Sequence, residues 1–112
     1  MNSQDIKDSI NRIEQAADEA KQACQSSQPP QALKDSIEQL HQRAREAKTS
    51  ASSQADEAGM RQPVMQLEQA ADRAMQACRT AGSSDRPLQQ AVQKAHDEAS
   101  RLKKQIEGKP SA

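Results

Sequence analysis

The chain has 112 residues, of which 33% are hydrophobic and none is aromatic, and its 16 Lys and Arg residues balance 16 Asp and Glu residues. Without clustered positive charge, or aromatic rings that stack on bases, this composition argues against a nucleic acid partner. No stretch approaches the roughly 20 apolar residues of a membrane span, and alanine-dominated helices are expected to bind membranes weakly, so no membrane partner is expected. The length suits a single helical domain over 1–112.

The first residues, 1–8, lack the basic segment and apolar run of a secretory signal peptide. Two cysteines, Cys24 and Cys78, are expected to be reduced thiols in a chain without an export signal. We therefore expect a cytoplasmic protein.

Apolar side chains recur at intervals of four and three residues from Ile6 to Cys24. This spacing predicts a helix that packs along its whole length against another helix. Segment 26–30 (SSQPP) then provides capping serines and prolines suited to a first helical turn. A second helix with the same stripe follows, from Leu33 to Ala51. The predicted core of this half is Ile6, Ile10, Ile13, Ala17, Ala20, Cys24, Leu33, Ile37, Leu40, Ala44, Ala47 and Ala51.

Segment 49–53 (TSASS) is predicted to be the joint between two halves of the chain. The start of the third helix is ambiguous. Ser53 and Asp56 are typical of an early helix cap, whereas Pro63 favours a start near Gln62. A kinked or 3₁₀ first turn reconciles the two signals.

The stripe then returns in a third segment that ends at Cys78, with each position 54 residues after its counterpart in the first (78 − 24 = 54). A fourth segment ends at Ile106 and follows the second by 55 residues (106 − 51 = 55). Segment 81–87 (AGSSDRP) predicts the turn between them, and 108–110 (GKP) predicts the end of the last helix. The predicted core of this half is Met60, Val64, Leu67, Ala71, Ala74, Cys78, Leu88, Val92, Ala95, Ala99, Leu102 and Ile106.

Each half is predicted to fold back on itself, because facing positions of an antiparallel pair have residue numbers with a constant sum. The core positions pair at a sum of 57 in the first half (13 + 44) and 166 in the second (67 + 99). We predict an all-α fold of two tandem antiparallel αα-hairpins, 3–48 and 54–107, in an up-down-up-down four-helix bundle with heptad-like, Ala-rich packing. Contact of helix one with helix three, or of hairpin with hairpin, is predicted at Ala16, Ala23, Ala70 and Ala77.

The charged side chains are predicted to lie on solvated faces, with pairs one turn apart such as Asp8 with Arg12 and Asp97 with Arg101. Large core side chains are few. The bundle is therefore expected to be marginally stable alone or to gain stability by pairing with another chain.

Cys24 and Cys78 are interpreted as small core residues, and a disulfide between them requires helices one and three to be neighbours rather than diagonal. The equivalent residues His41 and His96 are interpreted as histidines at the edge of the core. His41 is level with Ala16, about 12 Å along the axis from Cys24, and that is too far to share a zinc ion.

One pair comes closest to the Glu-x-x-His motif of carboxylate-bridged metal bundles, namely Glu38 with His41. It has no counterpart, because Gln93 stands where the second half would need the glutamate. We therefore expect no metal ligands, no cofactor and no catalytic residues.

The leading hypothesis is a non-enzymatic cytoplasmic bundle that acts through protein–protein contact, with a protein partner or by self-association, as an adaptor, a regulator or a homo-oligomer subunit. No small-molecule substrate is expected. The alternative is a thiol-redox or metal-responsive protein that uses Cys24 and Cys78. A third hypothesis is a hydrophilic stress-protection protein that becomes helical on drying or crowding.

Overall fold

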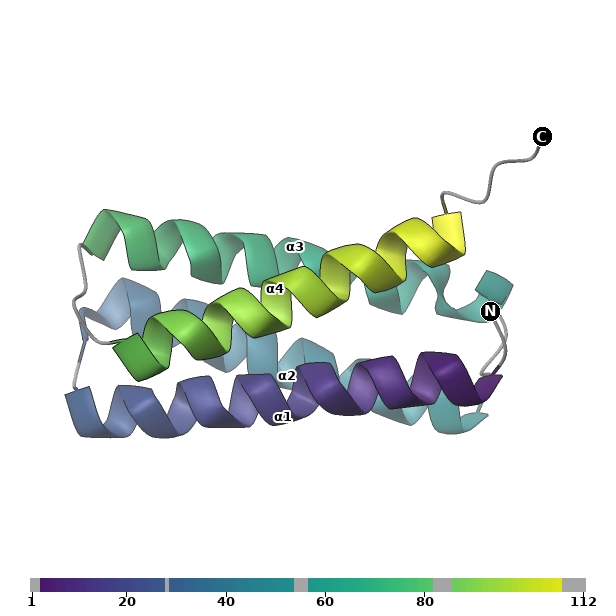
Figure 1. The fold of residues 1–112 in the computed structure, drawn as a ribbon, viewed down its shortest axis with the longest axis horizontal. Helices are drawn as coiled ribbons and strands as arrows, with labels where there is room; N and C mark the ends of the chain where they lie inside the picture. Colours follow the sequence, from purple (N-terminus) through teal and green to yellow (C-terminus); the bar gives the residue numbers. More distant parts are fainter. Residues whose placement is uncertain (1–2, 28, 54–56, 82–85, 108–112) are drawn as a thin grey trace.

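A computed structural model shows four helices, and it describes residues 3–27, 29–53, 57–81 and 86–107. The helices are α1 (Ser3–Ser27), α2 (Gln31–Ser53), α3 (Glu57–Ala81) and α4 (Arg86–Glu107). In Figure 1 they alternate in direction, and the end of α1 lies at the same end of the bundle as the starts of α2 and α4. The predicted all-α, up-down-up-down four-helix bundle is confirmed.

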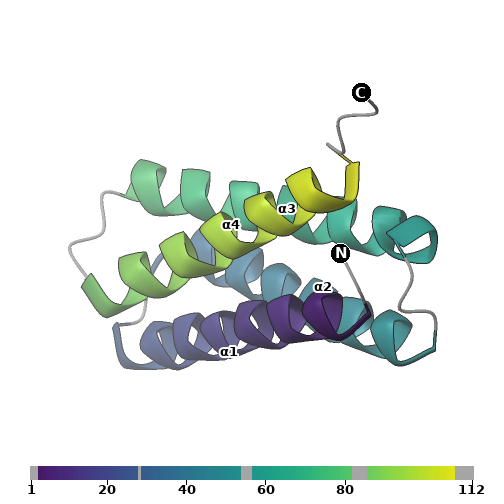
Figure 2. The same ribbon diagram turned by 45° about the vertical axis from the view of Figure 1, so that its right-hand side comes forward.

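The helices form a closed ring of neighbours. α1 packs against α2 and α4, and α3 packs against the same two helices, so α1 and α3 lie diagonally across the bundle (Figures 1 and 2). The two hairpins therefore meet through α1 with α4 and through α2 with α3. The predicted contact of helix one with helix three is wrong, and the alternative contact of hairpin with hairpin is correct. Ala16 lines the surface between α1 and α4.

All twenty-four predicted core residues are buried, and Ala16, Ala70 and Ala91 join them. The one buried polar residue among those described is Ser9, with 3% of its surface exposed. No large hydrophobic side chain is exposed in the described part of the chain. The heptad-like stripe thus accounts for the core, and the described surface is polar.

Helix α2 runs through segment 49–53 and ends at Ser53. The prediction that this segment is the joint between the two hairpins is therefore wrong. Ala51 belongs to the apolar stripe and is buried, which favours another helical turn. Three hydroxyls in this segment donate back to the carbonyl four residues earlier, which lets serine and threonine lie within a helix. The donors are Thr49, Ser52 and Ser53, and the acceptors are the carbonyls of Arg45, Lys48 and Thr49.

Helix α3 begins at Glu57 and is α-helical throughout, so of the two alternatives the early start is correct and the start near Gln62 is wrong, and its described first turn is not 3₁₀. Pro63 lies inside this helix. The proline ring removes one backbone donor and normally disfavours a helix interior. Burial of Met60 and Val64 on either side of it offsets this cost, because the first turns of α3 complete the core.

Prolines of both predicted turns lie at the starts of helices, as the sequence predicts. Pro30 precedes α2, and its carbonyl accepts hydrogen bonds from the backbone N–H groups of Leu33 at 3.0 Å and Lys34 at 3.1 Å. Pro87 is the second residue of α4. The cap predicted at Asp56, the turn residue Gly82 and the end predicted at 108–110 lie outside the described residues. None of the described helices combines the length and the apolar character that crossing a membrane requires.

Candidate functional site

Two kinds of polar contact between the helices of a hairpin occur in both hairpins, whereas the pair of Lys21 and Glu38 occurs in the first hairpin alone. In the first hairpin, Lys48 Nζ on α2 lies 3.1 Å from Glu14 Oε1 on α1. In the second, Lys103 Nζ on α4 lies 3.7 Å from Glu68 Oε1 on α3. These four residues are equivalent in the repeat, so the pairs are explained by the hairpin architecture itself.

Each histidine also contacts an aspartate across its hairpin. His41 Nε2 lies 2.5 Å from Asp18 Oδ1, and His96 Nε2 lies 2.6 Å from Asp72 Oδ1. The histidine side chains are 13% and 24% exposed, which confirms their place at the edge of the core. The apolar stripe predicts this place for the histidines, but it does not predict their contacts with the aspartates.

The second hairpin gathers one more donor at its histidine. Ligand atoms of Glu68, Asp72 and His96 all lie within 4.8 Å of one another, and we call these residues the His96 cluster. His96 Nδ1 is buried without a hydrogen bond, the one such side-chain atom in the described part of the chain. It lies 3.6 Å from Asp97 Oδ1.

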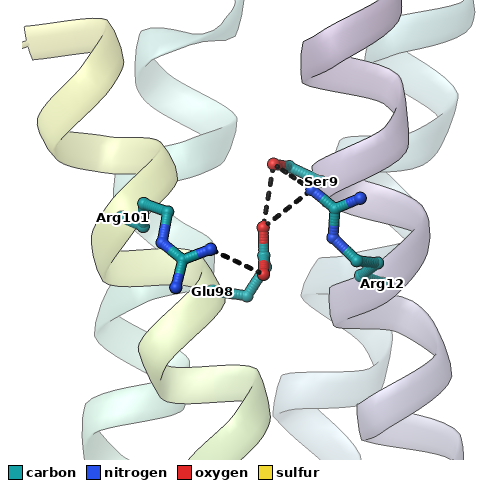
Figure 3. A network of polar contacts seen from close by, with 4 residues as sticks. All are labelled: Ser9, Arg12, Glu98 and Arg101. Carbon is teal, nitrogen blue, oxygen red and sulfur yellow. Dashed lines mark hydrogen bonds and ion pairs between the residues drawn. The ribbon is translucent and has the colours of Figure 1, made fainter.

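A second polar arrangement joins the two hairpins and has no duplicate. Glu98 on α4 reaches toward α1, where the hydroxyl of Ser9 donates to its Oε2 at 3.0 Å and Arg12 Nη2 donates to the same oxygen at 3.1 Å (Figure 3). Arg12 also donates to the Ser9 oxygen at 3.3 Å. Arg101 Nη1 lies 3.7 Å from Glu98 Oε1. We call these four residues the Glu98 network.

The Glu98 network corrects two predictions. Arg12 and Arg101 converge on Glu98 from two helices, although they were predicted to pair with aspartates of their own helices. Glu98 was predicted to lie on a solvated face, but only 13% of its side chain is exposed. The same correction applies to Glu68, whose side chain is 14% exposed.

The surroundings of Glu98 act on its pKa in opposite directions. Burial raises the pKa of the carboxyl, while hydrogen bonds from Arg12 and Ser9 and the charges of Arg12 and Arg101 lower it. The hydrogen bonds and charges together outweigh burial, so the pKa of Glu98 lies below its ordinary value of 4.5. Glu98 is therefore a carboxylate at neutral pH, held by donors on three sides.

The equivalent positions between α3 and α2 do not form this network. Pro63 stands in the place of Ser9 (9 + 54 = 63) and has no hydroxyl, and Gln66 stands in the place of Arg12. On α2 the two charges are exchanged, since Arg43 and Glu46 replace Glu98 and Arg101. Arg43 pairs with Glu46 within α2 at 2.9 Å. The Glu98 network is thus a feature that duplication does not explain.

Two surface hollows flank the Glu98 network, with volumes of about 350 and 410 Å³, and Arg12, Glu98 and Arg101 line both. We call the whole surface the α1–α4 groove. On one side of the network the groove carries Gln15, Ala16, Glu19, Lys94 and Asp97, and on the other Asp5, Asp8, Ser9 and Gln105. Both signs of charge are therefore presented along one face.

The two cysteines are buried thiols in the core, as predicted. Cys24 lies on α1 and Cys78 on α3, which are the diagonal helices. Axes of diagonal helices are separated by more than the 8–10 Å of packed neighbours, whereas a disulfide needs Cα atoms about 5.5 Å apart. A disulfide between Cys24 and Cys78 within one chain would require α1 and α3 to be neighbours, and they are not.

A signal for the His96 cluster was present in the sequence. The pairing sum of 166 places His96 level with position 70 (166 − 96 = 70), and Glu68 and Asp72 are one turn apart on either side of it. For the Glu98 network no such signal exists, because neither pairing sum relates α1 to α4.

Comparisons with protein-family models, with curated proteins and with solved structures find no match to this chain.

Proposed function

We propose that this chain is a non-enzymatic protein that acts by reversible, charge-guided contact with a protein partner, and that the α1–α4 groove is its contact surface. The observation that carries the proposal is the Glu98 network, a partly buried ionic arrangement between two hollows that, among the described residues, occurs at the α1–α4 interface and not at the equivalent α2–α3 interface. The Glu–Lys and His–Asp contacts within the hairpins occur in both copies, whereas this network occurs in one.

The nature of the surface limits the kind of partner. Cores of obligate subunit interfaces are strongly apolar, and the described surface has no exposed large hydrophobic side chain. Exposed charges of both signs speed up encounter and fix orientation more than they add affinity. The partner that fits best is a polar segment bearing both charges, bound reversibly.

A non-enzymatic role agrees with the composition, since the chain has no aromatic residues, three glycines and two histidines from which to build a pocket. Two buried thiols suit a reducing compartment, and we place the role in the cytoplasm on that ground. The alternative thiol function is weaker, because burial keeps thiols inert and the two cysteines lie on diagonal helices.

Exchange of an exposed ion pair across the groove tests the proposal. Lys94 Nζ lies 3.6 Å from Glu19 Oε1, and both side chains are more than half exposed. The variant E19K/K94E keeps an ion pair between α1 and α4 and the net charge, but it inverts the charge pattern of the groove. The matched control is K21E/E38K, which exchanges the exposed pair of Lys21 and Glu38 at 3.3 Å between α1 and α2.

Tagged wild-type chain, the groove variant and the control are used to capture binding proteins from the native cell, and the captured protein is then purified and titrated. We expect capture by wild type and control, and its loss with E19K/K94E. We also expect binding to fall as salt rises, since the screening length drops from about 10 Å at 0.1 M to about 3 Å at 1 M. A partner that binds both variants equally well would place the contact elsewhere and overturn the proposal.

A further inference from the structure

We propose that Glu68, Asp72 and His96 form a binding site for a divalent first-row transition ion, with Zn²⁺ as its representative, and that the ion links α3 to α4. The three ligands lie outside the lining of the α1–α4 groove, whereas Asp97, which faces His96, belongs to that lining. Its donor set of two carboxylates and one imidazole suits zinc, which takes oxygen and nitrogen ligands at about 2.0–2.2 Å and leaves a fourth position for water in open sites.

The fold brings the three donors together from two elements. Glu68 and Asp72 are one turn apart on α3, so their side chains lie on the same face of the helix. His96 reaches them from α4, with Nε2 2.6 Å from Asp72 Oδ1. All three ligand atoms lie within 4.8 Å of one another. Small side-chain rotations suffice to bring them to the spacing of about 3–3.5 Å that a tetrahedral ion imposes.

A second observation in favour of an ion site is the state of His96 Nδ1, the ring nitrogen that does not contact Asp72. Nδ1 is buried without a hydrogen bond, and Asp97 Oδ1 lies 3.6 Å from it. A neutral imidazole that donates from Nε2 to Asp72 has no proton on Nδ1. When an ion takes Nε2, the proton resides on Nδ1 and faces the Asp97 carboxylate. Metal-bound histidines normally donate their other ring N–H to such a carboxylate, which fixes the ring and raises its basicity.

One cation competes for the site. Lys103 Nζ lies 3.7 Å from Glu68 Oε1, and its side chain is 35% exposed. A long side chain at the surface can turn into water at little cost, since a surface ion pair contributes only about 0–1 kcal/mol. Lys103 therefore leaves when the ion binds, and Glu68 keeps a charged partner in either state.

The first hairpin supplies a matched comparison within the same molecule. Glu14, Asp18 and His41 occupy the equivalent positions, but Gln42 stands where the second hairpin has Asp97 (97 − 55 = 42). Glu14 is also held more closely by its lysine, at 3.1 Å from Lys48. The proposal thus assigns ion binding to one hairpin and not to its copy.

The test is a Zn²⁺ titration of the full chain near neutral pH by calorimetry, with the imidazole signals followed by NMR. We expect one equivalent of Zn²⁺ to bind and to move the ring signals of His96 but not those of His41. The variant H96Q is expected to weaken binding more than about 100-fold, and D97N about 10–100-fold. The variants H41Q and C24A/C78A are expected to leave the dissociation constant within about twofold.

Circular dichroism of each variant without metal shows whether it is folded. The histidine and aspartate variants change side chains at the surface or the edge of the core, and C24A/C78A replaces two small buried side chains by alanine. We therefore expect helical spectra. The proposal is overturned if no saturable binding occurs, if H96Q binds as tightly as wild type, or if H41Q or the cysteine variant abolishes binding. We expect E19K/K94E to lose partner capture and to bind Zn²⁺ as tightly as wild type, so failure of one proposal can be told from failure of the other.

Discussion

The replacement Glu98→Ala is the most informative perturbation of the bundle, because it removes the carboxylate oxygen that accepts a hydrogen bond from the Ser9 hydroxyl at 3.0 Å. Ser9 is 3% exposed, so its hydroxyl hydrogen has little access to water. The same replacement breaks the ion pair with Arg12, whose side chain is 58% exposed and remains solvated.

The magnitude follows from these two losses. A buried donor left unsatisfied costs about 1–3 kcal/mol, and a largely exposed ion pair is worth about 0.2–1 kcal/mol. We therefore expect Glu98→Ala to lower the free energy of unfolding by about 2 kcal/mol, which for a chain of this size corresponds to about 8 °C in Tm. The double variant S9A/E98A is expected to cost about 1 kcal/mol less than the sum of its parts, because removal of both hydrogen-bonding partners is nearly neutral.

Urea unfolding followed by far-ultraviolet circular dichroism measures these changes, and the repeat provides the control. Arg43 occupies the position equivalent to Glu98 and pairs within its own helix, so Arg43→Ala should change the stability by less than about 0.5 kcal/mol. Equal losses for Glu98→Ala and Arg43→Ala, or strict additivity with Ser9→Ala, would show that the contact of Glu98 with Ser9 does not stabilise the bundle.

Three further predictions concern the core, the pH dependence and the thiols. Ile13 and Ala44 are fully buried, and the pairing sum of 57 predicts that they face each other. I13A should therefore cost about 2–5 kcal/mol and A44L about 1–3 kcal/mol. The double variant should recover part of both losses in urea unfolding, and additive losses would show that the two residues do not face each other. Because the folded-state pKa of Glu98 is lowered, its contribution to stability is present above pH 4.5 and is lost as the pH falls through the folded-state value. E98Q should therefore reduce the dependence of the free energy of unfolding on pH below pH 4.5. An unchanged dependence, measured by acid unfolding, would contradict this. Under mild oxidation, mass measurement should find no intramolecular disulfide between Cys24 and Cys78, and its rapid formation in the monomer would mean that α1 and α3 are neighbours.

The sequence predicted the packing of this fold well and its helix ends less well. All positions of the stripe from Ile6 to Ile106 are buried, because a buried helix face repeats at a fixed interval, and Ala16, Ala70 and Ala91 are buried beside it. Segment 49–53 was misassigned because its serines are typical of turns, whereas the buried Ala51 and hydroxyls bonded to preceding carbonyls extend α2. At Pro63 the local preference against a helix yielded to burial of the residues around it.

The candidate sites were harder to predict than the core. The His96 cluster follows from one pairing sum and a spacing of one turn, so its residues were within reach of the sequence. The Glu98 network depends on which way the hairpins turn to meet, and the repeat alone allows α1 to lie beside α3 or beside α4. That choice is made by tertiary packing, in which Ser9 is buried against Glu98, and no spacing within a helix records it.

Whether the chain works through the α1–α4 groove is decided by the dissociation constant of the captured partner for E19K/K94E and for K21E/E38K, measured at the same salt concentration. Both variants exchange an exposed ion pair and preserve net charge, and they differ in that Lys94 and Glu19 belong to the α1–α4 groove. We predict that the groove variant binds at least about tenfold more weakly than wild type, a loss of about 1.4 kcal/mol in binding free energy. The control should stay within about twofold of wild type. Equal affinities for the two variants would contradict the claim that the chain works through this groove.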